Sequence, residues 1–257
     1  MADGARKGLG ARRLAAIAVA FVGIVVVLVI ALGPGGFGGL FGGVSPAERA
    51  DQVLAGIKAE APYVATLERS RPDVYAALRD GLIRDAEADT PVMLMANNGR
   101  RVLAAWLQQA IATAPDAVAL ELLAMTTDQL RELQQSNPQL CAAMVSGQPI
   151  EDVDAFVSDA MRTRERTAYE ALAAAPADAA VVTLPAAEVD AAYQAIAPDL
   201  AERFGADFDR FRGTDPTTLD PARFCEIQIA LLDGVAAMGP QRAAALARSI
   251  LGGGGDE

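Results

Sequence analysis

The sequence predicts an all-α protein. Alanine is abundant, apolar residues recur at three- and four-residue steps from position 45 onward, and prolines stand where several of these periodic segments begin. No segment alternates between apolar and polar residues for long enough to support a sheet. The 257 residues are 52% hydrophobic, so the chain can bury a core. We expect one transmembrane helix, a glycine-rich tether and a soluble bundle of about eight to ten short helices.

The membrane segment is predicted over residues 14–32. These 19 residues carry no charged or strongly polar side chain, and a helix of this length extends roughly 28 Å, close to the thickness of the hydrocarbon core of a bilayer. Four basic side chains precede it: Arg6, Lys7, Arg12 and Arg13. The first basic residue after it is Arg49. By the positive-inside rule, residues 1–13 are a cytoplasmic tail and the chain after residue 32 is exported.

We therefore expect a single-pass signal anchor whose residues 14–32 contact the lipid bilayer. The excess of arginine over lysine and the abundance of alanine suit a GC-rich bacterial genome. The expected location is the bacterial inner membrane, with the C-terminal domain on the periplasmic or extracytoplasmic side. A cleaved signal peptide is the competing interpretation, because residues 31–33 imitate a cleavage site, although Pro34 would then follow the cut.

Residues 33–44 form the glycine-rich linker. Glycine leaves the backbone few restraints, so we expect this segment to act as a tether. Its large apolar side chains are expected to lie in the headgroup zone: Phe37, Leu40 and Phe41. The exported helical domain then covers residues 45–251, and the glycines within residues 252–257 predict a disordered tail.

The helical domain begins with a capping box. Ser45-Pro46-Ala47-Glu48 pairs a serine acceptor with a glutamate three residues later and starts a helix over residues 46–60. Further helices are predicted from Pro62, from Pro72 and over residues 91–114, the last as one long helix or two shorter ones. The expected buried stripe of that segment is Met93, Leu94, Val102, Leu103, Trp106, Leu107 and Ile111. The polar residues 97–101 predict a turn, with a polar patch that faces a partner as the alternative.

The rest of the domain continues the helical pattern. Three helices are predicted over residues 116–135, 138–145 and 149–175. Residues 171–182 are small and alanine-rich, which makes them a candidate seam between subdomains. The next helix starts near Thr183, and Pro198 is expected to break it. A phenylalanine stripe (Phe204, Phe208 and Phe211), a helix from Pro221 and a last helix over residues 241–251 complete the fold.

A weak internal similarity relates residues 67–78 to residues 133–144. Leucine, serine, proline and two alanines coincide at a constant offset. One interpretation is a duplicated helical hairpin. The other is the common order of helix end, proline and helix start in an alanine-rich chain.

The chain has two cysteines, Cys141 and Cys225. Both follow the membrane segment, and an even number of cysteines in an exported domain favours a disulfide. Each lies near the start of a helix that begins with proline, so a bond would connect two helix N-termini. Two buried free thiols are the alternative. A redox-active pair is not expected, because the spacing is not that of a Cys-x-x-Cys motif.

Composition excludes several classes of function. The chain has no histidine, which removes imidazole-bound zinc and all catalysis that uses histidine. The net charge is −11, and residues 1–13 contribute +3, so the exported part is more acidic still and does not suit nucleic acid. Motifs for phosphate binding and for a nucleophilic serine are absent from the sequence. We expect no cofactor, no metal site and no catalytic residue.

The function predicted is that of a membrane-anchored, non-catalytic interaction or accessory protein of the bacterial cell envelope, with an unidentified protein partner there. One alternative is a carboxylate-dependent enzyme that acts on envelope glycans, with Glu226 as the nominal acid. Another is a helical domain that binds a ligand in an apolar cavity. A deep cleft with a buried acidic residue would favour the enzyme, and an exposed apolar patch would favour the interaction protein.

Overall fold

A computed structural model describes residues 44–146, 155–177, 179–213 and 218–253 of the chain. The predicted membrane segment, almost all of the tether, and Arg6, Lys7, Arg12 and Arg13 lie outside these residues. Within them the structure has eleven helices and no strand, so the predicted all-α class is confirmed. None of the described helices is by itself long and apolar enough to cross a bilayer; α5 and α6 meet that test only as a pair joined by a 118° bend.

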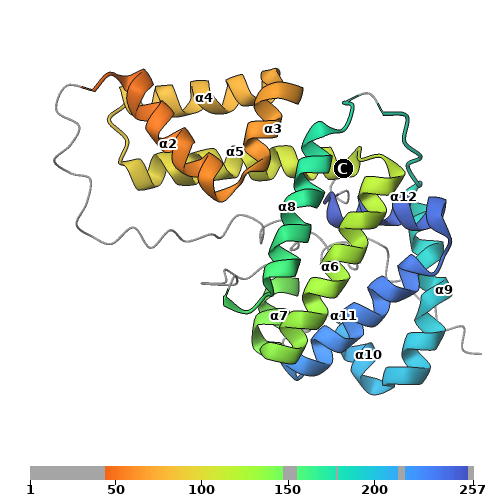
Figure 1. Cartoon of the computed structure of the whole chain (residues 1–257). Coiled ribbons are helices and arrows are strands. Elements are labelled where there is room, and N and C mark those ends of the chain that lie inside the picture. The colour runs from red at the N-terminus through yellow and green to blue at the C-terminus, as the bar shows by residue number, and fades with distance from the viewer. Residues whose placement is uncertain (1–43, 147–154, 178, 214–217, 254–257) are drawn as a thin grey trace, which may run out of the picture.

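The helices form two groups (Figure 1). The first contains α2 (Pro46–Glu60), α3 (Tyr63–Ser70), α4 (Pro72–Glu87) and α5 (Val92–Ala112). The second contains α6 (Asp116–Ser136), α7 (Pro138–Val145), α8 (Asp159–Ala174), α9 (Ala186–Phe204), α10 (Ala206–Phe211), α11 (Pro221–Ala236) and α12 (Pro240–Leu251). Helices α3 and α5 pack on α8, and α5 also packs on α12, so these contacts join the two groups.

Local sequence signals fix most of the helix starts. The capping box of α2 is present: the Glu48 amide donates to Ser45 Oγ, and the Ser45 amide donates to the Glu48 carboxylate at 2.8 Å. Asn137 and Asp220 accept hydrogen bonds from the first amides of α7 and α11. Proline occupies the first turn of α2, α4, α7, α11 and α12, where its missing N–H costs nothing.

The turn predicted at residues 97–101 was wrong, because α5 runs through them without a break. The reason is a close approach at Gly99. A Cβ there would lie 2.8 Å from Ile57 Cδ1 of α2 and 3.4 Å from the Leu78 and Leu82 methyl carbons of α4. The helix therefore buries its Gly99 side against α2 and α4, and this contact holds the polar stretch in helical form.

The same contact changes which residues of α5 are buried. Leu103, Trp106, Leu107 and Ile111 are buried as predicted, and Met95, Ala96 and Gly99 extend that stripe toward the start of the helix. The prediction was wrong for three side chains: Met93, Leu94 and Val102 are exposed.

Two further boundaries differ from the prediction. Helix α8 begins at Asp159 rather than near residue 149, because Ser158 caps it and is itself held by Glu132 of α6, whose carboxylate accepts from the Ser158 amide and hydroxyl at 2.9 Å. Helix α9 continues through Pro198, where a break was expected. Pro198 is exposed, and the buried side chains of Ile196 and Leu200 hold the helix on both sides of it.

The core of the second group includes the predicted phenylalanine stripe. Phe204, Phe208 and Phe211 are buried, and the ring of Phe211 lies 5.3 Å from that of Phe224 in α11.

The two segments with internal similarity also share a geometry. Helix α3 gives way to α4 at the single non-helical residue Arg71, and α6 gives way to α7 at the single non-helical residue Asn137.

A pair of glycine substitutions tests how closely α9 and α11 pack. At Gly234 of α11 a Cβ would lie 2.7 Å from Ile196 Cγ2 of α9, whereas at Gly56 of α2 it would meet nothing within 4 Å. Both glycines are in helix interiors, so alanine brings the same gain in helix propensity, about 1 kcal/mol. Gly56→Ala should stabilise the protein by that amount. Gly234→Ala should be less stable than Gly56→Ala by about 1–3 kcal/mol, as measured by urea unfolding, because of overpacking. Equal stabilities would contradict this packing.

Candidate interaction surface

The acidic residue that sequence analysis nominated for catalysis does not lie in a catalytic setting. Glu226 of α11 pairs with Arg203 at 3.3 Å and with Arg223 at 2.8 Å, and 35% of its side chain is exposed. Arg223 also pairs with Asp207, and Asp220 caps α11. Among the described residues no Asp or Glu is buried, and no group of three could hold a metal ion. The carboxylates near Glu226 therefore serve as ion-pair and cap partners.

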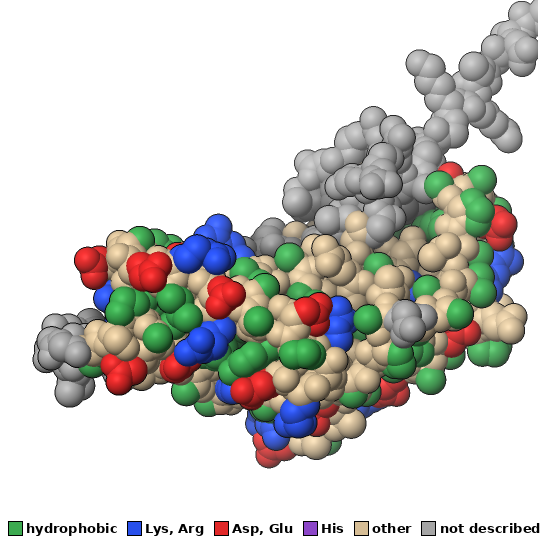
Figure 2. Space-filling view, turned by 90° about the horizontal axis from the view of Figure 1, so that it is seen from above, with side chains coloured by type: hydrophobic (Ala, Val, Ile, Leu, Met, Phe, Trp, Pro, Cys, Tyr) green, Lys and Arg blue, Asp and Glu red, His purple; other side chains and the backbone are tan. Residues whose placement is uncertain are grey.

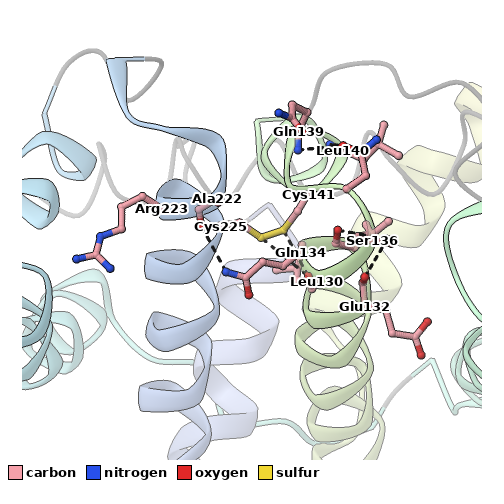
Figure 3. Close-up of a disulfide and its surroundings, with 12 residues drawn as sticks. Leu130, Glu132, Gln134, Ser136, Gln139, Leu140, Cys141, Ala222, Arg223 and Cys225 are labelled. Carbon is pink, nitrogen blue, oxygen red and sulfur yellow. Dashed lines mark hydrogen bonds between the residues drawn. A yellow bond between two sulfur atoms is a disulfide. The ribbon is translucent and has the colours of Figure 1, made fainter.

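Cys141 and Cys225 form a disulfide that joins α7 to α11 (Figure 3). Their Cα atoms are 5.9 Å apart, within the normal range, and both residues are fully buried. The sulfur atoms lie against α6, at 3.5 Å and 4.0 Å from the carbonyl oxygen of Leu130. The bond connects helix N-termini, as the positions of the two cysteines predict, and its burial makes it a structural bond rather than a reactive one.

Three aromatic side chains meet where the two helix groups touch. Tyr63 of α3 stacks on Trp106 of α5 at 6.1 Å and lies 5.7 Å from Tyr169 of α8. Burial raises the pKa of Tyr63 and of Tyr169, and the negative charge of Glu165 raises both further. Both phenols are therefore neutral at physiological pH, and the cluster serves the packing of α3, α5 and α8 on one another.

The exposed apolar residues of α5 form a different kind of surface. Met93 is 68% exposed, Leu94 48% and Val102 39%. Leu94, Asn98 and Val102 are four residues apart, so they follow one another along one side of the helix. Leu94 and Val102 are thus two exposed apolar side chains on one side of α5, with the polar Asn98 between them. Exposed apolar side chains that gather on one face and have polar neighbours are a feature of binding sites. This face was missed from the sequence because its residues were assigned to the core.

A small groove of about 180 Å³ lies between α4 and α5, next to this row. Its apolar walls come from Leu78, Leu82 and Val102, and Gly81 leaves it open on the α4 side. Polar groups line the other wall: Asn98 donates to the Asp85 carboxylate at 2.8 Å. We call the residues around this cavity the α4–α5 groove: Leu78, Gly81, Leu82, Arg84, Asp85, Asn98, Gly99 and Val102.

Two arginines at the groove differ from most others in the structure. Arg84 lines it and is exposed, and Arg101 donates to the Asn98 side chain; within the described ranges neither has a carboxylate partner in an ion pair. Several other arginines bridge helices. Arg164 of α8, for example, pairs with Glu121 and Asp128 of α6 at 2.6 and 2.7 Å. The groove thus combines the exposed apolar side chain of Val102 with Arg84, which lines it, and with Arg101, which is bound to the groove residue Asn98. Both cations are exposed, so an external carboxylate can reach them.

On the face shown in Figure 2, positive and negative side chains are interspersed with apolar ones over the helices. Comparisons with known protein families, with curated proteins and with solved structures found no match to this chain. The surface is therefore identified from its geometry and chemistry.

Proposed function

We propose that this chain is a membrane-anchored, non-catalytic interaction protein of the bacterial cell envelope. Residues 1–13 remain in the cytoplasm, residues 14–32 cross the inner membrane, and the acidic helical domain binds a protein partner on the extracytoplasmic side. The observation that carries the proposal is the α4–α5 groove, where the exposed Val102 side chain lies near Arg84 and Arg101, two arginines without ion pairs among the described residues. Buried carboxylates, which an enzyme of the alternative class would use, are not found among the described residues.

The chemistry of the groove defines the part of the partner that binds. At about 180 Å³ the cavity is smaller than typical cofactor or drug-sized sites, and it suits one inserted aliphatic side chain. Arg84 and Arg101 favour a carboxylate beside that side chain, and such rim charges act mainly on association rate and specificity. The partner segment we propose is therefore a stretch of protein chain with an aliphatic residue next to an aspartate or glutamate.

Site-specific photocrosslinking in native membranes tests this proposal. A photoreactive residue in place of Val102 should give one discrete protein adduct, whereas the same residue in place of Val182 should not, although Val182 is 59% exposed. Adding Arg84→Glu should reduce the Val102 adduct at least tenfold. Arg166→Glu, at an exposed arginine of α8 without a described ion pair, should leave it unchanged. Equal adducts at the two valines, or equal effects of the two arginine changes, would refute the groove as the binding site.

The membrane anchor has its own test. Replacing Ile24 and Val26 with arginine places two charges near the middle of the predicted span, each at a cost of about 2.5–3.5 kcal/mol of insertion free energy. The double variant should move from the membrane fraction to the soluble or aggregated fraction after alkaline extraction. The conservative variant Ile24→Leu with Val26→Leu should stay in the membrane. Full membrane retention of the arginine variant would contradict the span.

A further inference from the structure

A second apolar area lies at the other end of the exposed face of α5. It consists of Pro91, Met93 and Leu94, all exposed, and we call it the N-terminal α5 patch. Met93 and Leu94 are the two most exposed large apolar side chains of α5 in the described structure. They are about 12 Å along the helix from Val102, which separates this patch from the groove.

The chain enters the domain next to this patch. Arg49, in the first turn of α2, donates to the carbonyl oxygen of Thr90 at 2.8 Å and pairs with Asp89 at 3.5 Å. Thr90 directly precedes Pro91, where α5 begins. The first turn of α2 is therefore within one arginine side chain of Thr90, the residue before the patch. Ser45, which caps α2, is about 6 Å from Arg49 along the helix axis.

The residues just before Ser45 have the composition to cover an apolar surface. Phe37, Leu40 and Phe41 are separated by glycines, and residues 33–44 contain no charged side chain. Phe41 is four residues from Ser45, so extended chain can carry it about 13 Å from the cap, and Leu40 about 17 Å. Both reaches exceed the separation of about 6 Å along the helix axis between Ser45 and Arg49, whose side chain contacts Thr90 directly before the patch.

We propose that the segment Phe37–Phe41 of this same chain docks on the N-terminal α5 patch. Covalent connection favours this occupant over others, because a segment joined by a few residues has an effective concentration in the millimolar range. The glycines let the backbone come close to the helix surface. The docking itself does not depend on the proposed membrane anchor. If the anchor is present as well, docking shortens the tether and holds the start of α5 near the bilayer.

Disulfide trapping in the purified full-length protein tests this docking. With cysteines in place of Leu40 and Leu94, mild oxidation should form an intramolecular bond at least tenfold faster than with cysteines in place of Leu40 and Val182. The native Cys141–Cys225 bond is buried and does not interfere. Closeness alone could speed the reaction, so packing is tested by adding Phe37→Ser and Phe41→Ser to the Leu40–Leu94 pair. This addition should slow trapping at least fivefold.

Each outcome separates this inference from the proposed function. Trapping that is equally fast with Val182, or that is unaffected by the phenylalanine changes, would overturn docking. A bond between two molecules in place of one within a molecule would assign the patch to a second copy and would also overturn it. Photocrosslinking at Val102 reports on the groove independently, so loss of that adduct contradicts the proposed function and not the docking.

Discussion

Removing the Cys141–Cys225 bond should lower the free energy of unfolding by about 4.5 kcal/mol. The bond closes a loop of 84 residues and so lowers the conformational entropy of the unfolded chain. The loop-closure relation gives about 4.5 kcal/mol for a loop of this length. The bond also ties α7 to α11 across α6, so its loss acts on the centre of the second helix group. The measurement is urea unfolding of the double variant Cys141→Ala with Cys225→Ala.

The reduced wild-type protein is the control for that variant, since it loses the bond but keeps the sulfur atoms. Both cysteines are fully buried, so a thiol reductant should act on the folded protein only as fast as the domain unfolds. Reduction should therefore be at least a hundredfold faster in denaturing urea than in buffer. A double variant that loses less than about 1 kcal/mol would contradict the estimate.

Arg248→Met should be the next most destabilising change, at about 3 kcal/mol. Arg248 of α12 is 3% exposed and connects three parts of the chain: its guanidinium donates to the Ala114 carbonyl at 2.8 Å, to the Asp116 carboxylate at 2.8 Å and to the Val182 carbonyl at 2.9 Å. Methionine keeps most of the side-chain volume but leaves the carbonyl oxygens of Ala114 and Val182 without the donors that Arg248 supplies. The loss of such a donor costs about 1–3 kcal/mol for a buried acceptor.

Arg242 offers a matched control, because it is in the same helix but exposed and without a described ion pair. Arg242→Met should change the unfolding free energy by less than about 0.5 kcal/mol. Arg248→Lys should not restore stability, since a single ammonium cannot span the three acceptors as the planar guanidinium does. Thermal unfolding of the three variants measures these differences. Equal melting temperatures for Arg248→Met and Arg242→Met would disprove the connecting role of Arg248.

The start of a helix was predictable from the sequence where neighbouring residues, such as a capping serine or a proline, determine it. The capping box at Ser45 and the proline at Pro221 set their helix starts within the sequence itself, and both helices begin where expected. The start of α8 was not predictable in this way, because Ser158 is held by Glu132 from a different helix. The continuation of α9 through Pro198 was not predictable from local sequence either. It depends on the packing of α9 against α11 and α10, which are distant from Pro198 in the sequence.

The candidate surface could not be derived from the sequence for a related reason. Periodicity assigns an apolar residue to a helix face, but it does not say which of two apolar faces is covered. On α5 that choice is made by Gly99, which allows close contact with Ile57 and Leu78 and so leaves Leu94 and Val102 outside. Residues 97–101 had two interpretations from the sequence, a turn and a polar patch that faces a partner. Helix α5 runs through these residues, so the turn was wrong, and the partner-facing patch stays a prediction.

The aromatic cluster between the helix groups gives the protein a natural optical reporter. Trp106 is the only tryptophan of the chain and is 7% exposed. It stacks on Tyr63 of α3, and Tyr63 in turn contacts Tyr169 of α8. Its emission therefore comes from one place, next to the Tyr63–Tyr169 contact that joins α3 to α8. Any ligand, variant or solvent that separates the two groups should shift this emission to longer wavelength before the circular dichroism of the helices changes. Tryptophan fluorescence of the unmodified protein can thus report whether the two helix groups are packed together.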